Sequence, residues 1–146
     1  MAITRYDPNT VFLGGEHTQI GDLAASEAIT PGHLVERFNN AGVIRFRKHA
    51  TAAVETARLV ALNHSMVNKG VDDAYAANDL VEVSAGRGGS TYWMLIASGQ
   101  TIVAGDQLES AGDGTLRKQN GAGITLFSAL ENKTATALTR LRVEVV

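Results

Sequence analysis

The chain has 146 residues, no cysteine and a formal net charge of −2, which excludes disulfides and thiolate metal sites and argues against a nucleic-acid partner. No stretch offers the ~20 apolar residues that cross a bilayer, and the N-terminus lacks the apolar core of a signal peptide. We therefore expect a protein with no membrane partner that stays in the compartment where it is made.

The first 20 residues show no sustained hydrophobic period and contain Pro8. Apolar side chains are nevertheless scattered among them, at Ile3, Tyr6, Val11, Phe12 and Leu13. A tail that is only solvated would be poorer in such groups. Two interpretations remain open: an extended arm over residues 1–20 that docks on a neighbour through these side chains, or an edge strand of the chain's own domain.

One sequence pattern occurs twice, in residues 28–48 and 101–118. Each copy has an isoleucine, two residues, a glycine (Gly32 or Gly105), a polar residue, and then apolar and polar residues alternating around a glycine-bearing turn. Such alternation predicts a β-hairpin. Gly32 and Gly105 precede these hairpins, where a bend or a close backbone approach favours a residue without Cβ. The two copies are expected to form equivalent corners of a small β structure.

The turn of the second copy contains Asp113 and Gly114, a dipeptide that tolerates the positive φ of a tight hairpin. A fainter third copy covers residues 73–83, where Asn78 replaces the glycine.

Further strands are predicted at residues 58–63, 80–84, 91–97, 124–130 and 138–146 from short apolar runs between turn residues. Residues 51–65 have high helix propensity as well, and strand is preferred for 58–63 because β-like segments flank it. At this length two independent cores would each be small. The expected fold is mainly β, a single barrel-like or sandwich-like domain over residues 21–146 with at most one short helix.

No catalytic or cofactor site is predicted. The histidines are isolated in the sequence and are expected to be surface or hydrogen-bonded groups: His17, His33, His49 and His64. The acidic residues match no calcium loop and have no nucleophile beside them: Asp72, Asp73, Asp79, Asp106, Glu109 and Asp113. Residues 86–91 (GRGGST) lack the lysine of a phosphate-binding loop and are expected to be a loop between strands.

A basic cluster, Arg45, Arg47 and Lys48, fits the polar face of a strand better than a nucleic-acid patch. Trp93 lies in the most apolar predicted strand and is expected in the core.

Four segments of the sequence resemble segments of the small head-decoration (capsid cement) proteins of tailed bacteriophages. They are RKHATAA (47–53), GVDDAYAANDLV (70–81), GQTIVAGDQLESAGDGTLRK (99–118) and RLRVEVV (140–146). The resemblance covers residues 28–146, and residues 1–27 match no motif of that group.

The resemblance implies a non-enzymatic protein that is made in the host cytoplasm and located on the outer capsid surface of the virion. It would bind the major capsid protein of the expanded head, commonly as a homotrimer, and stabilise the contacts between capsid subunits. The alternative is a β-rich carbohydrate- or receptor-binding module of a phage fibre or head fibre, for which Tyr75, Tyr92 and Trp93 would be the candidate aromatic contacts.

Overall fold

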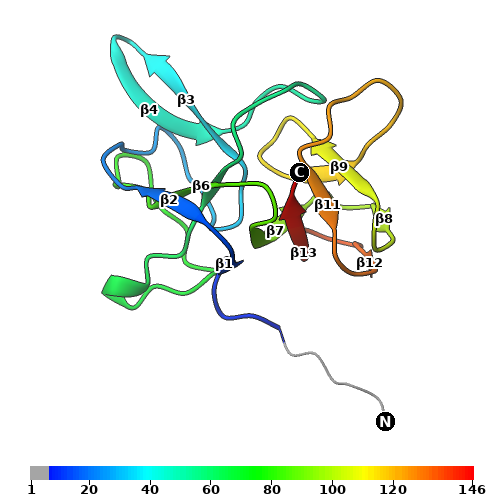
Figure 1. The fold of residues 1–146 in the computed structure, drawn as a ribbon. Coiled ribbons are helices and arrows are strands. Elements are labelled where there is room, and N and C mark those ends of the chain that lie inside the picture. The colour runs from blue at the N-terminus through cyan, green and yellow to red at the C-terminus, as the bar shows by residue number, and fades with distance from the viewer. Residues whose placement is uncertain (1–6) are drawn as a thin grey trace.

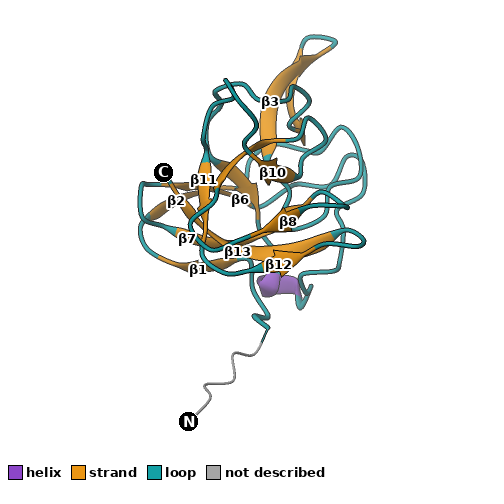
Figure 2. Ribbon diagram, turned by 90° about the vertical axis from the view of Figure 1, so that its right-hand side faces the viewer, coloured by secondary structure: helices purple, strands orange, loops and turns teal. Residues whose placement is uncertain are grey.

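The computed structural model describes residues 7–146, which form short β-strands joined by turns (Figure 1). The strands are β1 (Phe12–Gly14), β2 (His17–Ile20), β3 (Val35–Asn40), β4 (Val43–Lys48), β5 (Leu59–Ala61), β6 (Val83–Gly86), β7 (Thr91–Ile96), β8 (Thr101–Ile102), β9 (Gln107–Ser110), β10 (Leu116–Lys118), β11 (Phe127–Ala129), β12 (Lys133–Thr134) and β13 (Thr139–Val145). One 3-10 turn, η1 (Ser65–Val67), is the helical element of the described residues (Figure 2). The predicted mainly β class is confirmed.

Five strands close into a barrel in the order β7, β10, β9, β11, β13, with β13 pairing again with β7. The β13–β7 pair runs in antiparallel register from Thr139 opposite Ile96 to Glu144 opposite Thr91. Leu141 and Val143 are fully buried, whereas Arg140, Arg142 and Glu144, which alternate with them, are partly exposed. Such alternation is that of a half-buried strand, and the strand predicted at residues 138–146 is confirmed.

Two groups of apolar side chains form the core. The larger group fills the barrel and includes Leu108, Phe127 and Leu141. The smaller group is drawn from residues 25–83 and includes Phe46 and Tyr75. Figure 1 shows the same division, with β2, β3, β4 and β6 on one side and β8, β9, β11 and β12 on the other.

Strand β5 connects these two groups. Leu59 and Ala61 belong to the smaller core and Val60 to the larger, so both faces of this strand are buried. A strand buried on both faces has no polar positions, which is why its sequence also resembles a helix. Residues 51–58 form no helix, and the strand preferred for residues 58–63 is confirmed over Leu59–Ala61.

Both predicted hairpins are present. Strands β3 and β4 pair from Val35 opposite Lys48 to Asn40 opposite Val43, and β9 pairs with β10. The β3–β4 hairpin forms a two-stranded sheet of its own and projects from the body of the molecule (Figure 1). Residues 80–82 were predicted as strand, but β6 begins only at Val83.

Residues 12–20 also contribute strands to the domain. Strand β1 pairs with β7 through Phe12 and Tyr92, and β2 pairs along its whole length with β6, which pairs in turn with β5. Over residues 12–20 the chain therefore forms edge strands of its own domain, which is the second of the two interpretations of the N-terminal segment.

Candidate functional site

The repeated sequence pattern forms a repeated turn. Gly32, Asn78 and Gly105 occupy the same position in three turns, with φ of +96°, +76° and +94°. In each turn the following side chain accepts a hydrogen bond from a backbone N–H three residues earlier. The bonds run from Thr30 N to His33 Nδ1 at 3.0 Å, from Ala76 N to Asp79 Oδ2 at 2.9 Å, and from Val103 N to Asp106 Oδ2 at 2.9 Å. The bond from Val103 lowers the pKa of Asp106.

The first and third copies of the turn lie against each other. Ile29 and Tyr75 exchange both backbone hydrogen bonds, at 3.1 and 2.8 Å. The repeat therefore supports the fold directly, because a positive φ is needed at each corner and two of the corners pair.

The turn of the second copy packs on the base of the first hairpin. Leu34 N–H donates to the Gly114 carbonyl at 2.8 Å, and Gly114 N–H donates to the His49 carbonyl at 3.1 Å. Gly114 has φ of +83°, and a Cβ there would lie 2.9 Å from Lys48 Cβ. Asp113 Oδ1 accepts a hydrogen bond from Thr115 N at 3.0 Å. The Gly114 backbone thus holds the two copies together, and the Asp113 side chain shapes the turn that presents it.

Two histidines are buried at this junction. Burial, assisted by Lys48, lowers the pKa of His33 to about 4. Burial also lowers the pKa of His49. At Asp113 burial alone would raise the pKa, but the hydrogen bonds from Thr115 outweigh it and the pKa is lowered.

The apolar residues of the predicted arm have different surroundings. Ile3 and Tyr6 lie outside the described residues. Val11 is fully buried in the larger core, so its side chain is not available to a neighbour. Phe12 and Leu13 are half-buried in β1, and Phe12 stacks on His17 with ring centroids 3.8 Å apart.

The tip of the β3–β4 hairpin is an exposed apolar surface. Val43 and Ile44 are 55% and 47% exposed. Nearer the base, Arg47 pairs with Glu36 at 2.8 Å and lies over the Phe38 ring at 4.5 Å. These contacts hold the hairpin in shape, and the tip is free to meet another surface.

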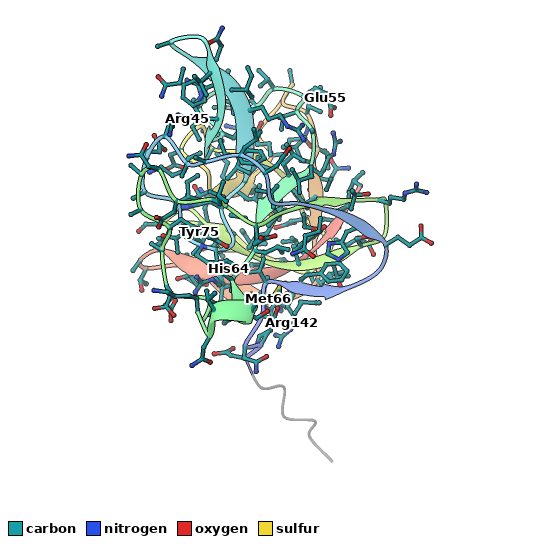
Figure 3. All side chains as sticks on the ribbon, turned by 90° about the vertical axis from the view of Figure 1, so that its left-hand side faces the viewer. Arg45, Glu55, His64, Met66, Tyr75 and Arg142 are labelled. Atoms are coloured by element: carbon teal, nitrogen blue, oxygen red, sulfur yellow. The ribbon has the colours of Figure 1, made fainter. Side chains whose placement is uncertain are left out.

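A pocket of about 380 Å³ lies on another face, beside η1. It is lined by His64, Val67, Lys69, Asp73, Ala74, Tyr75, Asn78, Asp79 and Leu80. In Figure 3, His64, Tyr75 and Met66 lie near one another on this face. This pocket was not predicted from the sequence. The sequence feature that could have indicated it is the run of turn-forming residues between 63 and 79, which predicts a long loop.

The remaining candidates are structural. His17 and His49 are hydrogen-bonded to Ser84 and Ser110 at 2.5 and 2.7 Å. Asp106, Glu109 and Asp113 do not meet, since their side chains are held by Lys118, Arg117 and Thr115 respectively. Of the segment 86–91, residues 87–90 form the loop between β6 and β7, and Gly86 and Thr91 belong to the two strands.

The described part of the chain holds no group of three or more acidic or histidine side chains suited to a metal ion. Within residues 7–146, no helix is long and apolar enough to span a bilayer. Among the aromatic candidates, Tyr92 is fully buried and Trp93 nearly so, as predicted for Trp93. Tyr75 is also mostly buried, but it lines the pocket.

These features define a β-barrel protein with a projecting hairpin. No protein-family model matches the chain, and no curated protein matches it. Among solved structures, it is similar to the N base of head fibre gp8.5 of bacteriophage phi29, with a TM-score of 0.58 and 14% sequence identity. The match covers 90% of this chain and 98% of that chain, so the two share a fold over nearly their whole length.

Proposed function

We propose that this chain is a non-enzymatic accessory protein of a tailed-phage head. It binds the outer surface of the expanded shell and stabilises the contacts between major capsid subunits. The main support is the shared fold with the base of a phage head fibre over 90% of the chain. The resemblance of residues 28–146 to head-decoration proteins is a second support for the proposal, because this resemblance rests on short sequence segments and not on the fold.

The projecting hairpin is the surface that we assign to the shell. Val43 and Ile44 expose apolar side chains at its tip, and burying such groups against a partner is favourable. The tip also carries Asn40, whose amide can donate and accept hydrogen bonds at the rim of a contact. Asn39 Oδ1 accepts from Gly42 N at 2.7 Å within the turn, and the Asn39 amide NH2 can still donate.

Assembly as a homotrimer would strengthen this attachment. One hairpin buries little surface and binds weakly, but three hairpins on one trimer raise the effective concentration of the second and third after the first has bound. A trimer that binds the expanded lattice better than the unexpanded one stabilises the expanded lattice by mass action.

A second candidate function is the base of a head fibre, with the receptor-binding role carried on the fibre. The observation that favours it is the match to 98% of a protein described as a head-fibre base. Electron micrographs of heads carrying the protein separate the two candidates, since a fibre base would sit beneath projecting fibre density and a cement protein would not.

Head stability tests the proposal. Heads from a phage that lacks the protein should release DNA at a lower temperature than complete heads, and adding the purified protein should restore the difference. Unchanged release temperatures with and without the protein would contradict the cement role. A variant that lacks residues 2–6 tests whether Ile3 and Tyr6 contribute, and it leaves the buried Val11 in place.

A further inference from the structure

The pocket beside η1 is formed by the third copy of the turn together with the loop that precedes it. Tyr75 and Asn78 come from that copy, and His64 and Lys69 from residues 64–69. Tyr75 is fixed in place because its hydroxyl donates to the Leu62 carbonyl at 2.6 Å. The His64 ring lies 6.5 Å from the Tyr75 ring, at 28° between planes. The pocket wall therefore includes two nearly parallel rings, one of them anchored to the core.

The rim of the pocket carries charges of both signs that have no ionic partner. Lys69, Asp73 and Asp79 form no ion pair with any described residue. Asp73 and Asp79 each use one carboxylate oxygen, Oδ2, to cap a turn, accepting from Gly70 N at 2.6 Å and Ala76 N at 2.9 Å. Their Oδ1 atoms and the Lys69 ammonium remain available to a ligand.

Charges of both signs on one rim discriminate among classes of ligand. A cationic side chain would be attracted by Asp73 and Asp79, but it only donates hydrogen bonds and leaves the Lys69 ammonium without an acceptor. An anion only accepts, and Asp73 and Asp79 would repel it. An apolar side chain would remove these charges from water without replacing their hydrogen bonds, which is costly. A neutral ligand with many hydroxyl groups satisfies both kinds of charge, because each hydroxyl both donates and accepts.

The apolar part of the lining fits the same class. Val67, Ala74 and Leu80 join the two rings in the wall, and the C–H faces of a sugar ring pack well on aromatic and aliphatic surfaces. The volume of about 380 Å³ lies near the lower end of the range of roughly 300–1,000 Å³ found for small-ligand sites. We propose that this pocket binds a neutral saccharide, one or two sugar units in size, presented by a glycan.

The site would add a function to the head protein and does not depend on attachment to the shell. The hairpin tip and the pocket are formed by different residues, 39–44 and 64–80. In Figure 3, Tyr75, His64 and Met66 lie on the body of the molecule, below the projecting hairpin. A protein fixed to a head through the hairpin could therefore keep the pocket open to the surrounding medium.

Titration of the full-length 15N-labelled protein tests the site. The probes are glucose, galactose, mannose, N-acetylglucosamine and the disaccharide of N-acetylglucosamine, each followed by amide chemical shifts. We expect saturable shifts confined to residues 64–80 for at least one probe, with a dissociation constant on the order of 1 mM. If no probe gives saturable shifts in these residues, the proposal is overturned.

Matched variants separate this pocket from non-specific contact. Lys69→Ala and Asp79→Asn should each weaken binding by roughly 3- to 10-fold, and asparagine keeps an oxygen that can cap the turn. Lys133→Ala removes a lysine from β12, outside the pocket, and should leave binding unchanged. Equal affinity in all three variants would overturn the assignment.

A short lysine- and arginine-rich peptide and an apolar peptide serve as competing ligands. Saturable shifts in residues 64–80 with either peptide, and none with the sugars, would identify a protein-docking site and contradict the proposal. The experiment uses isolated protein, so its outcome is independent of whether the chain binds phage heads.

Discussion

His49 Nδ1 lies 2.7 Å from Ser110 Oγ, and this buried contact joins the two copies of the repeated hairpin. His49 directly follows the first hairpin, and Ser110 ends strand β9 of the second. The same junction contains His33, whose ring lies close to Gly114. The two halves of the molecule are therefore linked through side chains that can take up a proton.

Acid should weaken this junction. The pKa of His33 falls from 6.5 to about 4 on folding, so between these values the unfolded chain binds more protons than the folded chain. Its contribution to stability is fully present above pH 6.5 and is lost as the pH falls towards 4. We expect a loss on the order of 3 kcal/mol in the free energy of unfolding between about pH 7 and pH 4. His49 acts in the same direction, as does Asp113 at still lower pH.

Thermal unfolding at several pH values measures this effect, with His33→Asn as the control. Asparagine offers an oxygen to the Thr30 N–H, as Asp106 does to Val103 in the second copy, but it does not titrate. This variant should lose much of the pH dependence. An equally steep dependence in the variant would show that His33 is not its source.

Gly105 should tolerate asparagine but not valine. Its φ is +94° and a Cβ there meets no neighbouring atom, so the cost of substitution is conformational alone. Gly105→Val should reduce the free energy of unfolding by about 2–3 kcal/mol. Gly105→Asn should cost much less, because Asn78 holds the equivalent position at +76°. Urea unfolding of both variants measures the difference, and equal losses would contradict the equivalence of the two turns.

The buried Glu109 carboxylate should destabilise the fold when its partner Arg117 is removed. Glu109 is fully buried and accepts hydrogen bonds from Arg117 Nε at 3.3 Å and Asn120 N at 3.1 Å. Arg117→Ala leaves a buried carboxylate without its ionic partner and should cost about 2 kcal/mol, reduced from the full penalty because Arg117 is partly exposed. Adding Glu109→Gln should recover part of this loss, since the glutamine is neutral.

Arg47→Ala is the matched control for Arg117→Ala. Arg47 pairs with Glu36 at the corresponding cross-strand position of the first hairpin, but Glu36 retains contact with water. We expect a loss of about 1 kcal/mol, which includes its contact with Phe38. Calorimetry of Arg117→Ala, of Arg117→Ala with Glu109→Gln, and of Arg47→Ala measures the loss in the free energy of unfolding for each. A larger loss for Arg47→Ala than for Arg117→Ala would be inconsistent with the burial of Glu109.

The hairpin tip should affect attachment without affecting folding. Val43→Asp and Ile44→Asp place a charge on side chains that are already exposed, so the unfolding temperature should change little. Binding to expanded heads should weaken by at least tenfold if the tip is buried against the shell. Leu138→Asp changes an equally exposed residue at 56% and should bind normally. Normal binding by both tip variants would exclude the hairpin as the contact.

Local sequence signals predicted much of the fold. The hairpins at β3–β4 and β9–β10 and the closing strand β13 follow from period-two alternation beside glycine turns, and both signals lie within a few residues of each other. The positive φ at Asn78 matches its place as the glycine substitute in the third copy. These features depend on neighbours along the chain.

Other features depend on contacts between distant segments. Val11 looks like part of a tail in the sequence, but it is buried because β1 pairs with β7, about 80 residues later. The barrel closes through β13 and β7, a pairing that no local pattern specifies. The pocket is assembled from a loop and a turn whose residues are individually ordinary for exposed, irregular structure.

Co-sedimentation of the purified protein with expanded heads that lack it tests the central proposal most directly, with unexpanded heads as the control. The proposal requires saturable binding to expanded heads and little binding to unexpanded heads. Bound protein per head should saturate at a multiple of three for a trimer. Absence of binding to expanded heads, or equal binding to both forms, would contradict a cement role.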